Sequence, residues 1–592
     1  MNNTKSKVWI FTFEYAGVVK FGGLGEVPAN QTKYLKDIFD ISVFIPSHGQ
    51  IERLKNIYSW KKAPYTYKEK INPNFLGIFN QEEEIKISFY DFLINDIKVI
   101  LVAGENPFTK RFLDDNVVYN PDTFNGKMIF FSLGMRNYIN YILSTNRDDL
   151  PFLVHLHDYH VVPAYINMKQ ELNKNHMDVS SIITIHLLTY PRQPFQFYEK
   201  CGIDNTPINI PMKDGYKNLT LEQIFTICND SFKYRSVKLP SVEKIGAIIS
   251  NLVTTVSESY LKYDIIPNLG ADLIEFKSDF VWNGCDWNYE EIHANILDKL
   301  GNEIREILGL SVDSEITRED LKKYLLTYKI GNLKKSPLIY SKKILDVIKM
   351  ISNKNPLINN GNTKTFKESG PLVITTGRIS PQKGFEDVFE SVSGVVNAIP
   401  NAKFLFLILP TDYSLKEMEY YAQFVKTYPN NVRIIFGIAP EIFYLAHMAA
   451  DVYCALSRWE PFGIIALEAM ALKLPIIATK VGGLQESIID IRSDEENCTG
   501  YLIEKENPNH FTEALISFFH LAKISKKDDI YQTEILQMIN QIPDEVIKSR
   551  VILDPHFYNK IKENCYNRVH NNFRWKIVTK KLIKLYKNLN IY

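Results

Sequence analysis

The chain has 592 residues, a length that favours two large domains. Hydrophobic residues make up 45% of it and charged residues 23%, which is ordinary for a soluble globular protein. The formal net charge of +1 gives no global attraction to nucleic acid or to an acidic membrane, so neither is expected as a partner. Scattered cysteines, a polar N-terminus without a signal peptide and the lack of a long apolar run predict a cytoplasmic protein without disulfides or a membrane span.

The first predicted strand, residues 7–13, leads through a loop carrying Glu14 into a glycine turn. The turn, residues 20–24 with the sequence KFGGL, precedes a predicted helix over residues 26–35 and then a second strand. Strand, glycine turn, helix and strand form the start of a doubly wound α/β sheet. Glycines at a helix start expose N–H groups to an anion, and Lys20 adds a positive charge there.

Two later strands of this half end in polar residues. The stretch 153–160 reads LVHLHDYH and carries His157 and Asp158, while the strand over residues 181–186 ends in His186. Open α/β sheets bind ligands at the carboxyl ends of their strands, which makes His186 a candidate for a site. For each histidine taken alone, the alternative is a satisfied core residue.

A long segment, residues 287–369, separates the two halves. Helical periodicity covers residues 290–308 and 319–328, and the stretch 353–370 is rich in Asn, Lys and Gly and predicts an exposed loop. No function is assigned to this insertion. It is interpreted as surface helices or as a contact between copies of the chain in a homo-oligomer.

The second half opens with a strand over residues 371–376, followed by a turn and a helix from residue 385. The turn carries two cations, Arg378 and Lys383. Such a pair suits a diphosphate, because Arg binds it in a bidentate manner and Lys acts as a point charge. As a lone pair, the same cations would more often be solvated.

The sequence SRWEPFGIIALEAM, residues 457–470, follows another buried strand. Pro461 predicts the first turn of a helix, which places Glu460 at the helix start and Glu468 a little over two turns later. Both carboxylates can then face one cleft, and Gly463 lets a ligand approach N–H groups without intrahelical partners. The alternative is a capped helix with two solvated glutamates.

Five ordered motifs between about residues 8 and 490 resemble the glycogen and starch synthase family of retaining glycosyltransferases. They are the KFGGL turn, the HDY segment at residues 157–159, the Thr-x-His end of the strand over residues 181–186, the GRISPQKG turn, and the two glutamates with seven residues between them ahead of a Gly-Gly turn. The resemblance implies an α/β protein of the GT-B fold, with two facing Rossmann-like domains, parallel sheets and an active-site cleft between them. It places an acceptor and catalytic domain at 1–280, a junction with a helical insertion at 281–370, a donor domain at 371–570 and a helix at 571–592 that returns to the first domain.

The implied reaction moves glucose from a nucleoside diphosphate glucose, ADP-glucose or UDP-glucose, to the non-reducing end of an α-1,4-glucan with retention of configuration. Neither a cofactor nor a metal is expected, since cations and helix N–H groups would stabilise the leaving diphosphate. The resemblance also implies that residues 190–240 form an expanded lid or acceptor-facing segment. It assigns catalytic roles to His186, Arg378, Lys383 and Glu460, donor contacts to Lys20, Gly22, Gly23, Asp158, Gly463, Ile464 and Glu468, and acceptor contacts to Glu14 and His157.

The sequence departs from the family at several points. The usual proline before the glycine turn is absent, Leu187 stands where asparagine is usual, and residues 460–478 read more like a sister family that includes sucrose and trehalose synthases. Two alternatives therefore stay open. One is a trehalose or sucrose synthase-like glucosyltransferase with a small acceptor, and the other is a non-catalytic glucan- or nucleotide-binding protein on the same fold.

Overall fold

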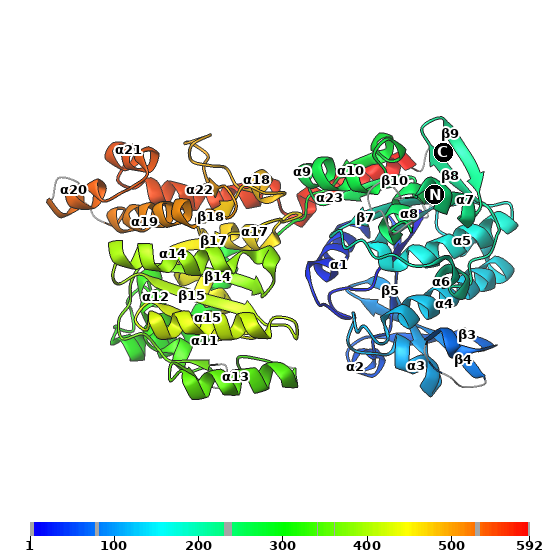
Figure 1. Cartoon of the computed structure of the whole chain (residues 1–592), viewed down its shortest axis with the longest axis horizontal. Helices are drawn as coiled ribbons and strands as arrows, with labels where there is room; N and C mark the ends of the chain where they lie inside the picture. The colour runs from blue at the N-terminus through cyan, green and yellow to red at the C-terminus, as the bar shows by residue number, and fades with distance from the viewer. Residues whose placement is uncertain are drawn as a thin grey trace. The chain divides into compact units, whose positions relative to one another are not determined.

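The computed structural model describes residues 5–76, 78, 82–229, 239–339, 341–359, 362–526 and 533–589. The chain divides into two compact units (Figure 1). The N-terminal unit comprises Met1–Gly284 together with Trp575–Tyr592, and the C-terminal unit comprises Cys285–Arg574. Among the described residues, no helix combines the length and the apolar character needed to cross a membrane.

The N-terminal unit is built on a nine-stranded sheet with the order β11-β10-β7-β6-β1-β2-β5-β4-β3. Its strands are β1 (Lys7–Phe11), β2 (Asp40–Pro46), β3 (Trp60–Ile71), β4 (Glu83–Ile94), β5 (Ile97–Gly104), β6 (Leu153–His157), β7 (Ser180–Ile185), β10 (Leu252–Thr255) and β11 (Ser278–Phe280). All neighbours pair in parallel except β3 with β4 and β4 with β5. The expectation of a parallel sheet is therefore corrected at this edge, where β3 is mostly exposed and rich in lysine, as suits an edge strand.

Helices pack around this sheet. They are α1 (Gly23–Leu35), α2 (Ile51–Lys55), α3 (Pro107–Leu113), α4 (Phe124–Thr145), α5 (Val162–Lys174), α6 (Phe195–Lys200), α7 (Leu221–Ile227), α8 (Val242–Ile249), α9 (Glu258–Tyr260), α10 (Ile266–Leu269) and α23 (Trp575–Leu589). The segment 190–240, which the resemblance implies is an expanded lid or acceptor-facing segment, contains α6, α7 and an antiparallel hairpin of β8 (Ile208–Met212) and β9 (Gly215–Leu219). Residues 230–238 of that segment lie outside the described residues.

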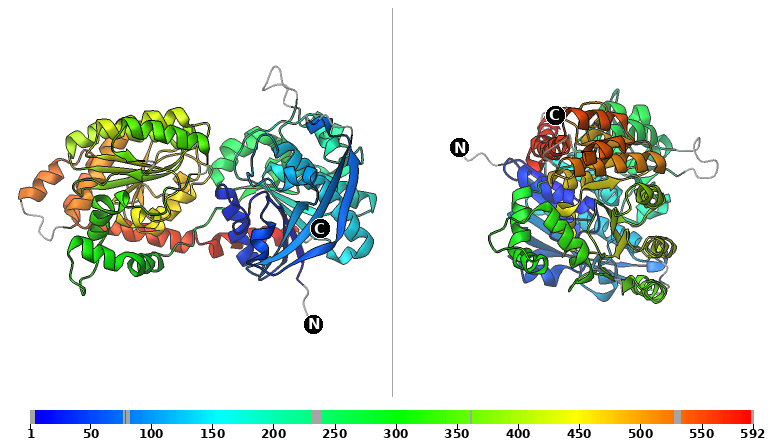
Figure 2. Two further views of the ribbon diagram at one scale, coloured as in Figure 1. Left: turned by 90° about the horizontal axis from the view of Figure 1, so that it is seen from below. Right: turned by 90° about the vertical axis from the view of Figure 1, so that its left-hand side faces the viewer.

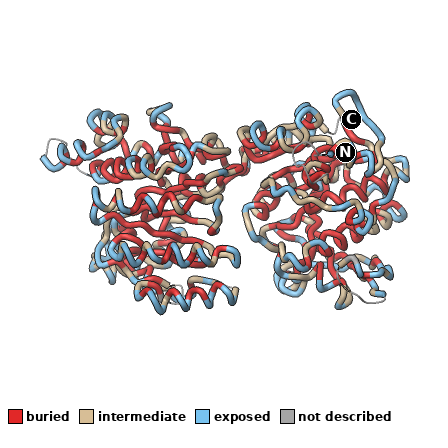
Figure 3. The backbone as a smooth tube through the Cα atoms, viewed as in Figure 1, coloured by how far each residue is buried: buried red, intermediate tan, exposed pale blue. Residues whose placement is uncertain are grey.

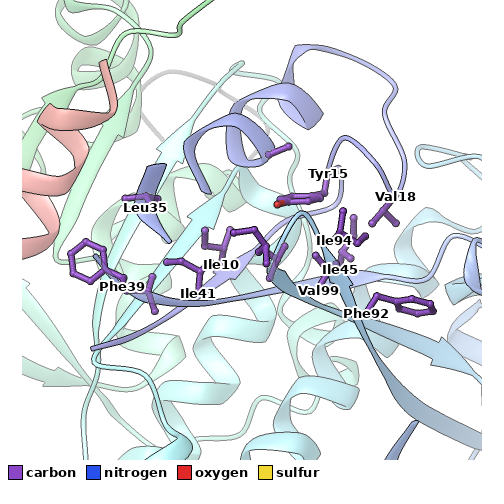
Figure 4. Close-up of a cluster of buried hydrophobic side chains, with 14 of the residues drawn as sticks. Ile10, Tyr15, Val18, Leu35, Phe39, Ile41, Ile45, Phe92, Ile94 and Val99 are labelled. Carbon is purple, nitrogen blue, oxygen red and sulfur yellow. The ribbon is translucent and has the colours of Figure 1, made fainter. Parts of the chain in front are cut away.

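The central strands are almost entirely buried, because parallel strands covered on both faces are near-continuous apolar runs (Figure 3). On one face, strand residues such as Ile10 and Ile41 pack against Leu35 and Phe39, as Figure 4 shows. The same cluster includes Tyr586 of α23, which is fully buried. The last helix of the chain is thus part of the core of the N-terminal unit.

The C-terminal unit has a six-stranded, wholly parallel sheet with the order β16-β15-β14-β17-β18-β19. Its strands are β14 (Leu372–Arg378), β15 (Lys403–Leu409), β16 (Val432–Phe436), β17 (Val452–Ala455), β18 (Ile476–Thr479) and β19 (Gly500–Ile503). Helices lie on both faces of this sheet (Figure 2). They include α14 (Phe385–Ala398), α15 (Leu415–Thr427), α16 (Phe443–Ala449), α17 (Ile464–Ala471), α18 (Leu484–Ser487), α19 (Pro508–Ile524), α20 (Thr533–Asn540), α21 (Glu545–Leu553) and α22 (Phe557–Asn572).

The insertion between the halves belongs to the C-terminal unit. Its helices are α11 (Tyr289–Leu308), α12 (Arg318–Thr327) and α13 (Lys342–Lys354). The Arg318 guanidinium donates to three backbone carbonyls of the unit, and Lys322 Nζ lies 2.7 Å from the buried Asp451 carboxylate. These polar contacts, of which the Lys322–Asp451 pair is fully buried, make α12 an integral part of the unit's packing.

The prediction of an exposed loop at 353–370 is wrong for several residues. Asn355, Ile358 and Phe366 are buried, and β12 (Ile358–Asn359) pairs with β13 (Asn362–Thr363). The Asn355 amide donates to the Ala422 carbonyl of α15 at 3.0 Å, so a residue type typical of loops makes a buried hydrogen bond to a neighbouring helix here. Composition alone does not reveal such a contact, because the partner is far away in the sequence.

Candidate active site

In the C-terminal unit, the loops that follow β14 and β17 hold Lys383 against Glu460. Lys383 Nζ lies 2.6 Å from Glu460 Oε2, and the Ser457 hydroxyl donates to the same oxygen at 3.3 Å. Both charged side chains are largely buried, at 17% and 10% exposure. The two loops are also joined through their backbones, because Arg458 N donates to the Gln382 carbonyl at 2.8 Å. A carboxylate and an ammonium group are therefore fixed at the carboxyl edge of this sheet.

Glycines make this close approach of loops feasible. A Cβ atom at Gly482 would lie 1.8 Å from the Glu460 carbonyl oxygen, and one at Gly384 would lie 2.0 Å from the Leu456 carbonyl oxygen. Both glycines have positive φ, as does Gly463 with φ of 88°. Any larger residue at these positions would combine steric overlap with a strained backbone.

The predicted start of the helix after β17 is corrected. Helix α17 begins at Ile464, with Gly463 as its N-cap, and Glu460 lies in the preceding turn instead of in the helix. The expectation that helical spacing places Glu460 and Glu468 on one face therefore does not apply. Glu468 is half-buried in the second turn of α17, and Arg378 is exposed at the end of β14. The first N–H groups of α17, including that of Ile464, point out of the helix start, as at any helix N-terminus.

In the N-terminal unit, Glu14 anchors the glycine turn from the inside. Its carboxylate is 2% exposed and accepts hydrogen bonds from the backbone N–H groups of Phe21 (2.6 Å) and Gly22 (2.9 Å). The Tyr119 hydroxyl donates to the other carboxylate oxygen at 2.5 Å. Glu14 thus contacts the turn that starts α1, and its contact with an acceptor stays a prediction.

Lys20 projects from the same turn and is half-exposed. Its Nζ lies 2.5 Å from Glu26 Oε1, and Glu26 is held in turn by the Asn30 amide at 2.9 Å. Gly22 is the N-cap of α1, which begins at Gly23. The structure brings the predicted cation and both predicted glycines together at one helix start, where the macrodipole favours an anion.

The predicted histidines and aspartate meet at the carboxyl ends of β6 and β7. Asp158 follows β6 directly and has φ of 60°, a strained conformation for a residue other than glycine. Its carboxylate accepts from the His186 backbone N–H at 2.7 Å, and its own N–H donates to the Thr184 carbonyl at 2.9 Å. His157 Nδ1 lies 2.9 Å from His186 Nε2, with the two rings stacked at 5.2 Å between centroids.

The electrostatics of this cluster follow from burial. Burial lowers the pKa of His186 to about 3 and lowers that of His157 well below its usual range, so both imidazoles are neutral near pH 7. Burial also raises the pKa of Asp158, and the nearby carboxylates of Glu243 and Glu14 act in the same direction. A neutral imidazole pair beside a buried acid can hold hydroxyl groups without bringing a fixed positive charge.

Sequence reasoning did not find Glu243, a fully buried residue of α8. Its carboxylate accepts from the backbone N–H groups of Thr189 and Tyr190, both at 3.0 Å, and so fixes the loop that follows His186. Leu188 N donates to the Tyr260 hydroxyl at 2.8 Å in the same loop. The sequence carries only one signal for Glu243, a charged residue inside an apolar helical run, and that signal does not identify its partners.

Two family models match the chain. Residues 7–273 match the starch synthase catalytic domain, and residues 359–533 match the glycosyl transferases group 1. The chain belongs to the glycogen and starch synthase family of glycosyltransferases. The family matches extend over both units, so the resemblance expected from the sequence motifs is confirmed, as is a glycogen synthase-like activity.

Curated members of the family are similar over most of their length. The glycogen synthase of Mycoplasma mobile is 24% identical over 525 residues, which cover 87% of this chain and 92% of the relative. The glycogen synthase of Thermodesulfovibrio yellowstonii is 23% identical over 531 residues, covering 86% and 89%. A solved structure, the catalytic domain of starch synthase IV from Arabidopsis thaliana bound to ADP and acarbose, aligns over the full length of both chains with a TM-score of 0.64 and 17% identity. The expected GT-B fold class is confirmed.

Proposed function

We propose that this glycosyltransferase moves glucose from a nucleoside diphosphate glucose, ADP-glucose or UDP-glucose, to the 4-hydroxyl at the non-reducing end of an α-1,4-glucan. The observation that carries the proposal is the Lys383–Glu460 pair, a largely buried cation and carboxylate bonded at 2.6 Å between glycine-rich turns. The names of the relatives, glycogen synthases and a starch synthase, support a glucan as the acceptor.

The C-terminal unit supplies the groups for the donor. One N–H of the Lys383 ammonium is used by Glu460, which leaves two donors for diphosphate oxygens. Glu460 Oε2 is bonded to Lys383 and Ser457, so the other oxygen, Oε1, is assigned to hydroxyls of the donor sugar. Arg378 and the N–H groups at Gly463 and Ile464 add positive potential for the leaving group, and Glu468 binds the nucleotide ribose.

The N-terminal unit supplies the groups for the reacting sugar and the acceptor. Lys20 and the helix start at Gly22 and Gly23 add a second cationic contact for the diphosphate. Asp158 and the backbone at His186 lie at the strand ends where the sugar ring is expected, and His157 orients the His186 ring.

In the proposed reaction, every bond broken or formed and every proton is accounted for without a cofactor. The bond between C1 of glucose and the diphosphate oxygen breaks, a new bond forms between C1 and the acceptor oxygen on the same face, and the hydroxyl proton moves to the leaving phosphate oxygen. Front-side displacement of this kind retains the configuration and needs no covalent enzyme intermediate. Positive charge that develops on the ring is stabilised by the carbonyl of His186, and negative charge on the diphosphate by Lys383 and Arg378.

The test is transfer of radiolabelled glucose from ADP-glucose and from UDP-glucose, separately, to glycogen and to free glucose. Label in the polymer from either donor supports the proposal and names the nucleotide. Label only in a disaccharide moves the protein to the small-acceptor class. No transfer from folded protein with any pair favours the non-catalytic binder.

A further inference from the structure

A chain of four buried hydrogen-bonding groups runs beneath the predicted histidine pair. Tyr586, on the last helix α23, places its hydroxyl 2.6 Å from His155 Nδ1. His155 Nε2 lies 2.7 Å from the Thr184 hydroxyl, which lies 2.7 Å from the Thr254 hydroxyl. Tyr586, His155 and Thr254 have no exposed surface and Thr184 has 6%. The groups come from α23, β6, β7 and β10, four elements of the N-terminal unit.

The direction of each hydrogen bond in this series follows from the last group in it, the Thr254 hydroxyl. The Thr254 hydroxyl has an acceptor in the Ile183 carbonyl at 3.4 Å, and we assign its proton to that contact, so that it accepts from Thr184. The Thr184 proton is then used, and His155 must donate to Thr184 through Nε2. That leaves Nδ1 of the neutral ring without a proton, ready to accept from the Tyr586 hydroxyl. Each hydroxyl donates once and the His155 ring has one fixed tautomer.

His155 is in contact with the site. Side chains two residues apart on a strand share a face, so His155 and His157 both project from β6 toward the face that α23 covers. Their ring centroids are 4.2 Å apart. His157 Nδ1 in turn lies 2.9 Å from His186 Nε2, while His157 Nε2 is buried and has no hydrogen-bond partner among the described residues. With one nitrogen unpaired, the orientation of His157 depends on ring packing, and His155 supplies one side of it.

We propose that Tyr586 is a positioning residue for the transferase reaction, acting through His155 on the His157–His186 pair. The hydroxyl of Tyr586 fixes the tautomer and ring orientation of His155, and the His155 ring then holds His157 in register with His186. The last helix thereby completes the N-terminal half of the site, although none of its residues belongs to the sequence motifs. The kinetic part of this inference rests on the proposed function.

Without the hydroxyl, Nδ1 of His155 is left buried with no donor. The ring can then rotate or change tautomer to find another partner, and the order of hydrogen bonds to Thr184 is lost. The expected consequence is a lower kcat with little change in donor KM, because the donor-binding cations Arg378 and Lys383 belong to the other unit and Lys20, on the glycine turn, is held by Glu26. A loss of helix packing would instead lower the fraction of folded enzyme.

The test compares Tyr586→Phe with Tyr165→Phe, a matched control. Tyr165 is also fully buried in the N-terminal unit, and its hydroxyl makes a long 3.4 Å bond to the Val179 carbonyl. With both proteins shown to be folded at the assay temperature, Tyr586→Phe should lower kcat by about tenfold or more, with donor KM within about twofold of wild type. Tyr165→Phe should stay within about twofold of wild type in both constants. A Tyr586→Phe enzyme that keeps more than about half of the wild-type kcat would overturn the proposal.

A double-mutant cycle with His155→Phe tests the route. If Tyr586 acts through His155, the double variant should be no slower than His155→Phe alone. Equal fold-losses from Tyr586→Phe in the wild-type and His155→Phe backgrounds would show an effect independent of His155 and contradict the proposal.

A readout that needs no turnover separates this proposal from the proposed function. In ¹⁵N-histidine spectra, assigned with His155→Phe, wild-type His155 should carry its proton on Nε2, and Tyr586→Phe should shift the signals of both His155 and His157. Unchanged His157 signals would overturn the proposal, even if the wild-type enzyme transfers no glucose from the donors tested.

Discussion

The replacement Lys383→Met tests the donor half of the site. It should lower both the stability of the protein and its kcat, and the two effects can be measured separately. With the ammonium nitrogen 2.6 Å from Glu460 Oε2, the attraction between the charges is about 6 kcal/mol at an effective dielectric of 20. Desolvation offsets much of this, so loss of one partner from the largely buried pair should destabilise the unit by about 3 kcal/mol. If the ammonium also stabilises the leaving diphosphate, kcat should fall by about 10²-fold to 10³-fold.

The assay combines initial rates of glucose transfer with urea unfolding of the same preparations. Lys262→Met is the control, because Lys262 is paired with Glu258 at 2.5 Å at an exposed site. That variant should change stability by about 0.5 kcal/mol or less and leave kcat unaltered.

The double variant Lys383→Met, Glu460→Gln distinguishes the two consequences. It removes the unpaired carboxylate, so stability should recover to within about 1 kcal/mol of wild type, while kcat stays as low as in the single variant or lower. The account is refuted if Lys383→Met retains a kcat near that of wild type. It is also refuted if the loss of unfolding free energy in the double variant equals the sum of the losses measured for Lys383→Met alone and for Glu460→Gln alone.

Three further results are expected. Gly482→Ala should destabilise the protein by about 2 kcal/mol more than Gly309→Ala in thermal unfolding. Both glycines have positive φ, but a Cβ at Gly482 would lie 1.8 Å from a carbonyl oxygen, whereas a Cβ at Gly309 would meet open space. Equal losses of stability in the two variants would contradict this. Burial lowers the pKa of His186 to about 3, below its unfolded value of about 6.5, so its contribution to stability is present above pH 6.5 and falls by up to about 1.4 kcal/mol per unit as the pH drops below that value. His186→Gln should therefore lose less unfolding free energy than wild type between pH 6.5 and 5. If the two proteins gave parallel curves of unfolding free energy against pH, the conclusion that the folded-state His186 ring is neutral would be refuted. Lys322→Met should cost about 3 kcal/mol in urea unfolding, because the buried Asp451 carboxylate would lose its 2.7 Å partner and keep the Lys526 ammonium at 3.8 Å. It should leave kcat per folded molecule unchanged, and a fall in kcat at full folding would contradict a purely structural role for Lys322.

Much of the fold could be predicted because parallel strands buried on both faces leave a plain signal in the sequence. The strands predicted over residues 7–13, 181–186 and 371–376 are all present, as Lys7–Phe11, Ser180–Ile185 and Leu372–Arg378, and their ends differ from the prediction by one or two residues. The antiparallel edge of β3 and β4 was not predicted, since β3 is polar and mostly exposed and lacks an apolar run. The helix start predicted from Pro461 is wrong, because a turn around Gly463 precedes α17 and the helix begins only at Ile464.

The residues of the candidate site also differ in whether the sequence alone could predict them. Residues that lie in local motifs, such as Lys383 and Glu460, could be singled out because residue type and spacing carry the chemistry. Residues that hold these motifs in place could not, because their partners are distant in sequence. Tyr586 meets His155 across 431 residues, and Tyr119 meets Glu14 across 105. Only the folded chain brings such pairs together.

The most direct test of the central claim is to extend a short α-1,4-linked oligosaccharide with the purified enzyme and to determine the new linkage by proton NMR. The account predicts that wild-type enzyme adds glucose at the non-reducing end through an α-1,4 bond, with the donor's anomeric configuration retained, and that Glu460→Gln adds it far more slowly. A β-linked product, or a product in which glucose is joined to the reducing end, would contradict the account.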